Sequence, residues 1–214
     1  MRTPEIDAAL HMALSPARLS RYIADSNGIL DSALSLYERN ARMGEAFYRP
    51  LQSLEICLRN HLSGQLAARY GTNWFKNGGP PFGQDLIDSI NHAMADLSQA
   101  NRQATPGAVI AELSFGFWVM VLSKRYDADL WRTTFTGVFR QGGSRMARQT
   151  VHNRMNDIRR FRNRVFHHEP IYHLSPDQMH ADIIQAIAWI CPDSAAWAYE
   201  HSRVPHVLSN PWPP

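Results

Sequence analysis

Apolar residues recur at helical spacing along nearly the whole chain, and helix-start and helix-end signals divide this pattern into segments. The first segment begins at Ser15-Pro16, where a capping serine precedes a proline, and ends at Asn27-Gly28. A long periodic stretch then runs from Asp31 to Gly71. Residues 72–83 are dense in Gly and Pro and predict a flexible loop.

The long stretch carries one proline and one apolar stripe. Pro50 has no backbone N–H to donate, so we expect a kink, or a break into two helices, near Arg49. The stripe predicts a buried face in the second half of the stretch, formed by Phe47, Leu51, Leu54, Leu58 and Leu62.

The segments after the loop predict shorter helices. They cover 84–100, a run from Thr105-Pro106 through the apolar AELSFGFWVMVL, 128–139, 145–167, a segment opened by Ser175-Pro176, and 193–202. We interpret Gly142-Gly143 as the turn that starts the helix over 145–167, which ends before Glu169-Pro170. No alternating strand pattern bounded by hairpin signals is evident. The sequence therefore predicts an all-α helical bundle, with long kinked N-terminal helices and short C-terminal helices, in a single domain over residues 1–214.

Composition narrows the class of protein. The 214 residues are 44% hydrophobic and 19% charged, which is ordinary for a globular protein. Cys57 and Cys191 stand alone, so we expect small core residues, not a disulfide scaffold or zinc module. The sequence has neither a stretch long enough to span a membrane nor an apolar leader, which favours a cytoplasmic protein with no membrane partner. Metal-ligand spacings and phosphate-binding loops are also missing, so we expect no metal and no cofactor.

The net charge of +3 hides an uneven distribution. Between positions 140 and 164, Asp157 is the only acid among eight arginines, so this segment carries a net charge of +7. Arginine presents a planar fork of donors that fits a phosphate, and a basic segment on a mildly acidic body favours a nucleic-acid partner. A solvated helix face explains the same pattern. The candidate phosphate contacts, besides Arg162, are Arg140, Arg145, Arg148, Arg154, Arg159, Arg160 and Arg164.

Arg162 differs from the other arginines in its place on the helix. It projects about 40° from the centre of the apolar face formed by Val151, Met155, Ile158, Phe161 and Val165, so it points toward the interior. A buried charge must be paired or line a cleft. If this helix packs antiparallel on the earlier stripe, Glu55 meets Arg162 in a semi-buried groove. The alternative is an ordinary i,i+4 pair between Glu55 and Arg59.

His167 and His168 follow Arg162 at the helix end. Histidine moves protons near neutral pH, and arginine stabilises charge on a phosphate, so with Asn163 these residues suffice for metal-free RNA cleavage by the substrate's own 2′-OH. Arg162 and His167 lie about 140° apart on an ideal helix. They converge only if His167 sits on a fraying last turn or if a second subunit supplies the other half. A favourable contact with the helix dipole is the alternative explanation for the two histidines.

The segment RNRVFHHEPIY closely resembles the R-N-x3-H signature of HEPN domains, and the whole chain resembles the Abi-like (abortive-infection) proteins of bacteria. The similar stretches are 36–62, 112–122 and 162–171. The resemblance implies an all-helical fold, a homodimer, and metal-independent endoribonuclease activity in many members. Other HEPN proteins have lost catalysis and bind nucleotides or RNA.

The resemblance also assigns roles to single residues. Arg162 and His167 match the catalytic pair, and Asn163 matches the polar residue after the arginine. Glu55 and Arg59 match a charged pair in the first conserved helix. His168 satisfies the looser form of the spacing and stays an alternative to His167.

Glu169 departs from one HEPN subgroup, the toxins paired with nucleotidyltransferase antitoxins, which have tyrosine at this position. Regulation through such a tyrosine is therefore not expected. If two copies share a groove rich in arginine, Glu55, Glu169 or a bound anion is expected to stabilise it. The run FGFWVMV is expected in the core or at a subunit interface.

The leading interpretation is a metal-independent endoribonuclease acting in phage defence or as a toxin. A non-catalytic RNA-binding or scaffold protein on the same fold is the alternative. The expected partners are RNA, a second copy of the chain, and an antitoxin or regulatory RNA.

Overall fold

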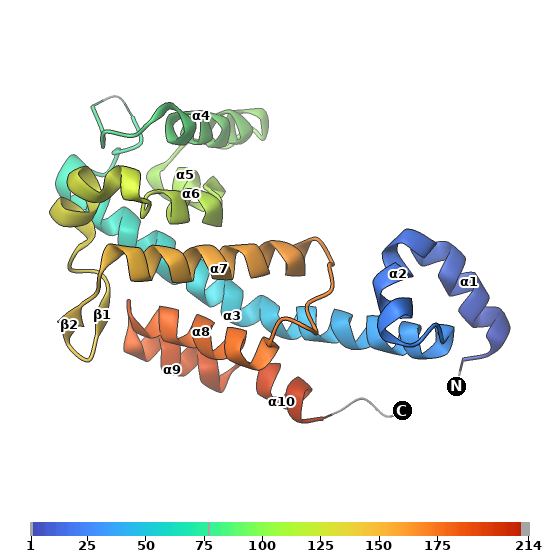
Figure 1. Cartoon of the computed structure of the whole chain (residues 1–214). Helices are drawn as coiled ribbons and strands as arrows, with labels where there is room; N and C mark the ends of the chain where they lie inside the picture. Colours follow the sequence, from blue (N-terminus) through green and yellow to red (C-terminus); the bar gives the residue numbers. More distant parts are fainter. Residues whose placement is uncertain (1, 77, 211–214) are drawn as a thin grey trace.

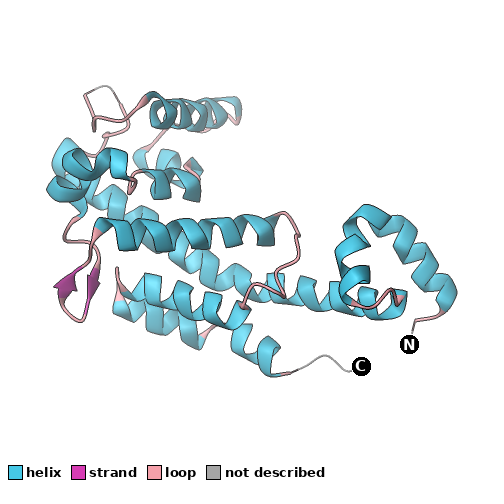
Figure 2. Ribbon diagram, viewed as in Figure 1, coloured by secondary structure: helices cyan, strands magenta, loops and turns pink. Residues whose placement is uncertain are grey.

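The computed structural model describes residues 2–76 and 78–210, and most of these residues are helical (Figures 1 and 2). The first half of the chain forms α1 (Pro4–Leu14), α2 (Pro16–Asp25), α3 (Leu30–Tyr70), α4 (Gln84–Gln99), α5 (Pro106–Glu112) and α6 (Phe115–Met120). The second half forms the 3₁₀ turn η1 (Lys124–Tyr126), the π-helix η2 (Asp127–Phe135), strands β1 (Arg140–Gln141) and β2 (Ser144–Arg145), and then α7 (Arg148–Phe166), α8 (Pro176–Ala188), α9 (Pro192–Glu200) and α10 (Val204–Ser209). The predicted helical character, the long N-terminal helix and the short C-terminal helices are confirmed.

The 41-residue helix α3 is the axis on which the other elements assemble. In Figure 1, α1 and α2 lie at its N-terminal end, α7 to α10 lie along its middle, and α4 to α6 lie near its C-terminal end. The main hydrophobic core joins α3 to α4–α10, while a second small cluster, formed by Leu19, Tyr22, Ala33 and Leu34, joins α2 to the start of α3. The site described below therefore rests on a helix that is held along its whole length.

Pro50 does not divide the long helix. Of the two alternatives, the break is wrong, because α3 continues through a buried Pro50. A proline inside a helix costs about 3 kcal/mol. Phe47, Leu51 and Leu54 are at most 3% exposed around it. Burial of each such side chain stabilises the fold by about 1.5–3 kcal/mol, which outweighs the lost hydrogen bond.

The prediction that the chain contains no strand is wrong for residues 140–145. Arg140 pairs with Arg145 and Gln141 with Ser144, which makes a short antiparallel hairpin, and α7 begins only at Arg148. Gly142 and Gly143 have φ of 55° and 80°, the left-handed conformation that a two-residue hairpin turn requires. The Gly-Gly pair is therefore a hairpin turn and not the start of the helix.

The helices just before η1, and the first and last helices of the chain, also differ from the prediction. The single helix expected from Thr105 is two helices, because Ser114 accepts a hydrogen bond from the Phe117 N–H and starts α6 anew. Helices α1 and α10 were not predicted, and the Pro-Trp-Pro-Pro end of the chain lies outside the described residues. The run FGFWVMV belongs mostly to the core, since Phe115, Phe117, Trp118 and Val119 are buried and Met120 is exposed. Among the described residues, no helix is long and apolar enough to cross a membrane.

Candidate functional site

Helix α7 packs its apolar stripe against α3 in the opposite chain direction (Figure 1). Val151, Met155 and Ile158 are fully buried, and the Phe161 ring lies 4.7 Å from the Phe47 ring between centroids. The predicted core face is confirmed for these residues. Arg162 follows Phe161 directly, so this packing brings the start of the motif against the middle of α3.

Glu55 and Arg162 meet between the two helices. The Arg162 Nη2 lies 3.6 Å from the Glu55 Oε2, with 29% and 24% of the two side chains exposed. The predicted semi-buried pair is confirmed. In the described part of the chain, Glu55 and Arg59 form no ion pair, so the i,i+4 alternative is wrong for this conformation.

The pair belongs to a cavity of about 280 Å³, which we call the arginine groove. It is lined by Tyr48, Gln52, Glu55, Ile56, Arg59, Arg162 and Phe166. The Nε atoms of Arg59 and Arg162 are buried and have no hydrogen-bond partner among the described residues. Buried donors without partners are costly, and a phosphate oxygen or water satisfies them.

Phe166 fixes the arginine from the other side. The Arg162 guanidinium carbon lies 4.1 Å from the centre of the Phe166 ring, the distance of a cation–π contact. The ring also contacts Tyr48, with 6.0 Å between centroids. Arg162 is therefore held by a carboxylate and an aromatic face, while its buried Nε has no hydrogen-bond partner among the described residues.

His167 lies at the end of α7 and outside the lining of the arginine groove. It is the C-cap residue, and its backbone N–H donates to the Asn163 carbonyl at 2.9 Å. Its position just beyond the helix agrees with the fraying-turn alternative, but its side chain is exposed. A single chain thus brings Arg162, Glu55 and Arg59 together and leaves His167 apart from them.

The helix end is held by two other parts of the chain. The Arg18 guanidinium donates to the carbonyls of His167 and His168, at 3.4 and 3.0 Å. His168 has a left-handed backbone with φ of 56°. On the other side of the loop, Arg164 lies 3.5 Å from the Glu169 carboxylate and donates to the Pro170 carbonyl. Glu169 thus stabilises the loop and does not reach the arginine groove.

Asn40 is a loop-anchoring residue that the sequence interpretation missed. Its Oδ1 accepts hydrogen bonds from the backbone N–H groups of Ile171 and Tyr172, and its Nδ2 donates to the Glu169 carbonyl. This one buried side chain on α3 therefore anchors the loop that follows the motif. A polar residue three positions before Met43 in an apolar register was the available signal.

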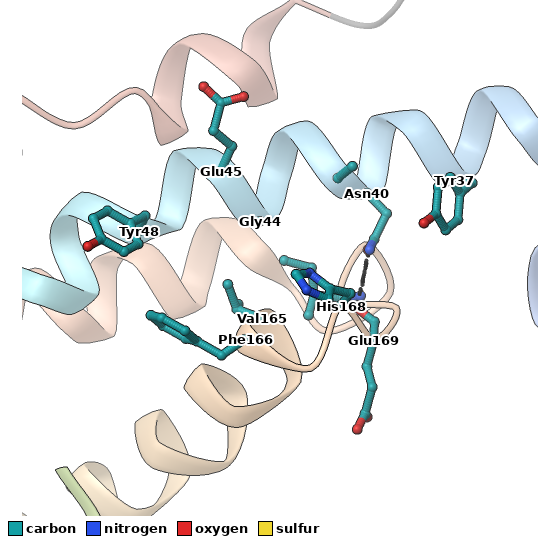
Figure 3. A pocket seen from close by; sticks show the side chains of 11 residues that line it. Tyr37, Asn40, Gly44, Glu45, Tyr48, Val165, Phe166, His168 and Glu169 are labelled. Carbon is teal, nitrogen blue, oxygen red and sulfur yellow. Dashed lines mark hydrogen bonds between the residues drawn. The ribbon is translucent and has the colours of Figure 1, made fainter. Parts of the chain in front are cut away.

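A second cavity, of about 400 Å³, lies between α3 and this loop (Figure 3). We call it the aromatic pocket. It is lined by Tyr37, Asn40, Ala41, Gly44, Glu45, Tyr48, Val165, Phe166, His168, Glu169 and Ile171. Tyr48 and Phe166 also line the arginine groove, so the two cavities are neighbours that share one pair of aromatic rings.

Two arginines in the N-terminal half of α7 form hydrogen bonds and ion pairs with other parts of the chain. Arg148 donates to the Leu122 carbonyl at 3.0 Å and lies 3.4 Å from the Asp127 carboxylate. Arg154 forms an ion pair with Asp182. Both side chains serve the packing of α7 on its neighbours, which reduces what they offer to a phosphate.

The remaining arginines proposed to bind phosphate differ in whether their donors already have partners within the chain. Arg159 donates twice to the Asn156 side chain, and Arg140 donates to carbonyls of its own hairpin. Arg145 and Arg160 are exposed to solvent. The basic surface available to a polyanion is therefore smaller than the charge of the segment indicates.

The two cysteines have structural surroundings. Cys57 is 7% exposed, and burial raises the pKa of its thiol to about 11, so it stays protonated near neutral pH. Cys191 is a free thiol that accepts a hydrogen bond from Ser194. In the part of the chain that the structure describes, no three His, Cys, Asp or Glu side chains gather into a metal-binding group.

Comparison of the chain with protein-family models, curated proteins and solved structures finds no match. The chemistry must be argued from the site itself. The arginine groove offers guanidinium donors to an anion, beside aromatic rings that offer faces to a planar group. This combination fits a phosphate that carries an unpaired base.

Proposed function

We propose that the chain is an Abi-like protein of the HEPN type, a metal-independent endoribonuclease that acts in phage defence or as a toxin. The observation that carries the proposal is the pairing of Arg162 with Glu55 in a half-buried groove, with the Arg162 Nε unpartnered. The same arginine opens the R-N-x3-H motif. An arginine kept partly out of water and short of one acceptor is suited to bind a phosphate.

The proposed reaction uses the substrate's own nucleophile. The 2′-oxygen of the RNA attacks the adjacent phosphorus, its proton is removed by a base, and the bond to the 5′-oxygen breaks as that oxygen gains a proton. The products end in a 2′,3′-cyclic phosphate and a 5′-hydroxyl. Arg162 stabilises the charge on the phosphate oxygens, and His167 transfers a proton. Asn163 would contribute a polar contact beside them.

We also propose that the active unit is a homodimer with a shared site. Because His167 does not line the arginine groove of its own chain, a second copy is the source of a histidine that faces it. Ile56 lines the groove outside the aromatic pocket and is 38% exposed, which leaves apolar surface for association beside it. FGFWVMV cannot take this role, since most of it is buried within the chain.

The alternative function is RNA binding without cleavage, or a scaffold on the same fold. The separation of His167 from the arginine groove within one chain favours it. Under this alternative, exposed arginines such as Arg145 and Arg160 hold RNA while no proton transfer occurs.

Incubation of the pure protein with a mixed RNA pool and a chelator distinguishes the two functions. Cleavage that persists in chelator and leaves 2′,3′-cyclic phosphate ends supports the nuclease. RNA retention without cleavage supports the alternative. Growth arrest on induced expression, relieved by Arg162→Ala with His167→Ala, tests the same proposal in cells, where any missing activating partner is present.

A mixed-dimer experiment tests the shared site. Sedimentation of the pure protein should give twice the chain mass. Arg162→Ala and His167→Ala chains should each be inactive and should regain activity when mixed, since the mixed dimer contains one intact pair. A monomer that cleaves RNA at full rate contradicts the shared site.

A further inference from the structure

The aromatic pocket has the shape and lining of a site for a planar group. Its volume of about 400 Å³ falls in the range of small-molecule sites. Tyr48 and Phe166, at one end, are 53% and 40% exposed, although large aromatic side chains usually gain stability from burial. His168 also lines the pocket, and Figure 3 shows Tyr37 farther along α3. A flat ligand against the Tyr48 and Phe166 rings would cover apolar ring surface that the chain leaves open.

Gly44 provides the open space on the α3 side of the pocket. A side chain at this position would meet only the Val165 Cγ1, at 3.9 Å from its first carbon. The lack of a side chain here leaves room along the helix at the point where the motif loop faces α3. A glycine inside a helix costs about 0.5–1 kcal/mol of stability relative to alanine, so the open space at Gly44 comes with a less stable helix.

The two carboxylates that line the pocket are placed so that their negative charges do not repel a nucleic acid bound there. In Figure 3 the Glu45 and Glu169 carboxylates point away from the space between Phe166 and His168. Glu45 lies 3.1 Å from the Arg203 guanidinium, and Glu169 lies 3.5 Å from that of Arg164. Both negative charges are therefore paired with arginines outside the space where a base would lie.

Two arginine-lined cavities adjoin the pocket. The arginine groove shares Tyr48 and Phe166 with it. A cavity of about 330 Å³ shares Glu45 with it and is lined by Arg39, Arg42 and Arg203. An apolar pocket next to arginine-lined cavities matches the alternation of base and phosphate along a single strand.

We propose that the aromatic pocket binds one unpaired base of the RNA substrate, next to the phosphate that the arginine groove holds. This inference rests on the proposed function and names its substrate class, single-stranded RNA with an accessible base. The base stacks on the Tyr48 and Phe166 rings, and His168 lines the pocket beside it. A base inside a duplex cannot enter the pocket, so paired regions of RNA are not substrates.

The test measures RNA binding without chemistry. The probes are a short fluorescent single-stranded RNA methylated at every 2′-oxygen, which blocks cleavage, and an oligomer of the same length without bases. Fluorescence anisotropy of the full-length wild type should show tighter binding of the RNA with bases. Gly44→Leu should weaken that binding about tenfold by filling the pocket, and should remove the preference over the abasic oligomer.

Gly64→Leu is the matched control. Gly64 lies in the same helix, and a side chain there meets nothing within 4 Å. This variant should bind both oligomers like the wild type. If Gly44→Leu does not fold, as judged by its thermal melt, Tyr48→Ala and Tyr48→Phe replace it. The alanine variant should lose about tenfold in affinity, and the phenylalanine variant should recover most of that loss because it keeps the ring.

The outcomes separate the inference from the function on which it rests. If the wild type prefers bases and the pocket variants keep that preference, the base pocket is wrong and the nuclease stands. If Gly44→Leu changes the sedimenting mass and not the preference for bases, the pocket is a contact between copies, which also overturns the inference. If the wild type binds neither oligomer, the base pocket and the proposed function both fail.

Discussion

Both halves of α7 carry arginines, but the arginines of the two halves differ in their hydrogen-bond and ion-pair partners. In the N-terminal half, Arg148 is bound by a carbonyl and a carboxylate of the chain, and only 13% of its side chain is exposed. In the C-terminal half, the Arg162 Nε is buried with no hydrogen-bond partner among the described residues. The first arginine holds α7 on its neighbours, and the second lines a cavity beside Glu55. A count of arginines along the helix does not separate these roles, but their partners do.

The largest effect should come from the C-terminal half. Arg162→Ala should lower the cleavage rate at least about 100-fold, because it removes charge stabilisation of the transition state. His167→Ala should lower it by about 10²–10⁴ through loss of proton transfer. His168→Ala should keep measurable cleavage with weaker RNA affinity. Single-turnover rates at saturating RNA give the comparison.

Arg148→Ala is the matched test from the other half. It should keep cleavage while lowering the melting temperature, since it removes the hydrogen bond to the Leu122 carbonyl and leaves Asp127 paired with Arg132 alone. An Arg148→Ala protein that stays folded and loses as much cleavage as Arg162→Ala would show that the two halves do not differ. An inactive His168→Ala beside an active His167→Ala would move the histidine role to His168.

Glu55→Gln should have a smaller and split effect. Removing the carboxylate 3.6 Å from Arg162 frees the guanidinium to bind phosphate more tightly, so RNA affinity should rise. The maximal rate should fall about tenfold, because the arginine loses the partner that orients it. Separate measurement of KM and kcat shows the split. A fall in both affinity and rate would indicate that Glu55 itself contacts RNA.

The sequence predicted the groove better than it predicted the loops. Helical spacing placed Arg162 near the core face, because burial of Phe161 and Ile158 leaves the helix little rotational freedom, but it left the Glu55–Arg162 pair as one of two alternatives. It could not show that Arg154 is paired, since Asp182 lies on another helix and only tertiary packing joins them.

The hairpin and the role of Asn40 were missed because neither leaves a trace in the spacing of apolar residues. The hairpin at Gly142-Gly143 depends on positive φ at two residues, which periodicity does not detect. The role of Asn40 depends on where a distant loop passes, at positions 169–172. Periodic burial reports which face of a segment is covered, so it detects neither a backbone conformation at two adjacent residues nor a contact between distant parts of the sequence.

Arg154→Ala should reduce stability and leave the chemistry in place. The ion pair with Asp182 is partly buried, with 28% and 19% of the side chains exposed, and its loss leaves Asp182 with the hydrogen bond from Gln178 and no charged partner. We expect the free energy of unfolding to fall by about 1 kcal/mol. Arg160→Ala, at an exposed position, should stay within about 0.5 kcal/mol of the wild type. Chemical denaturation measures the free energy of unfolding of both variants. Equal losses of stability would show that the paired Arg154 contributes no more to the fold than the exposed Arg160.

The smallest effect concerns His152, which lies on α7 between the two arginines of the N-terminal half. Burial lowers the pKa of His152, and the Arg148 charge lowers it further. Arg148→Gln should therefore raise this pKa toward 6.5, as an NMR titration of the ring protons would show. Because the folded chain holds His152 with a depressed pKa, the unfolded chain binds more protons, and stability falls as the pH drops below about 6.5. Arg148→Gln should weaken that pH dependence, while Arg145→Gln, on the exposed hairpin, should not change it. A His152 pKa that Arg148→Gln leaves in place would mean that Arg148 is screened at this position, and that its role is limited to the contacts with Asp127 and Leu122.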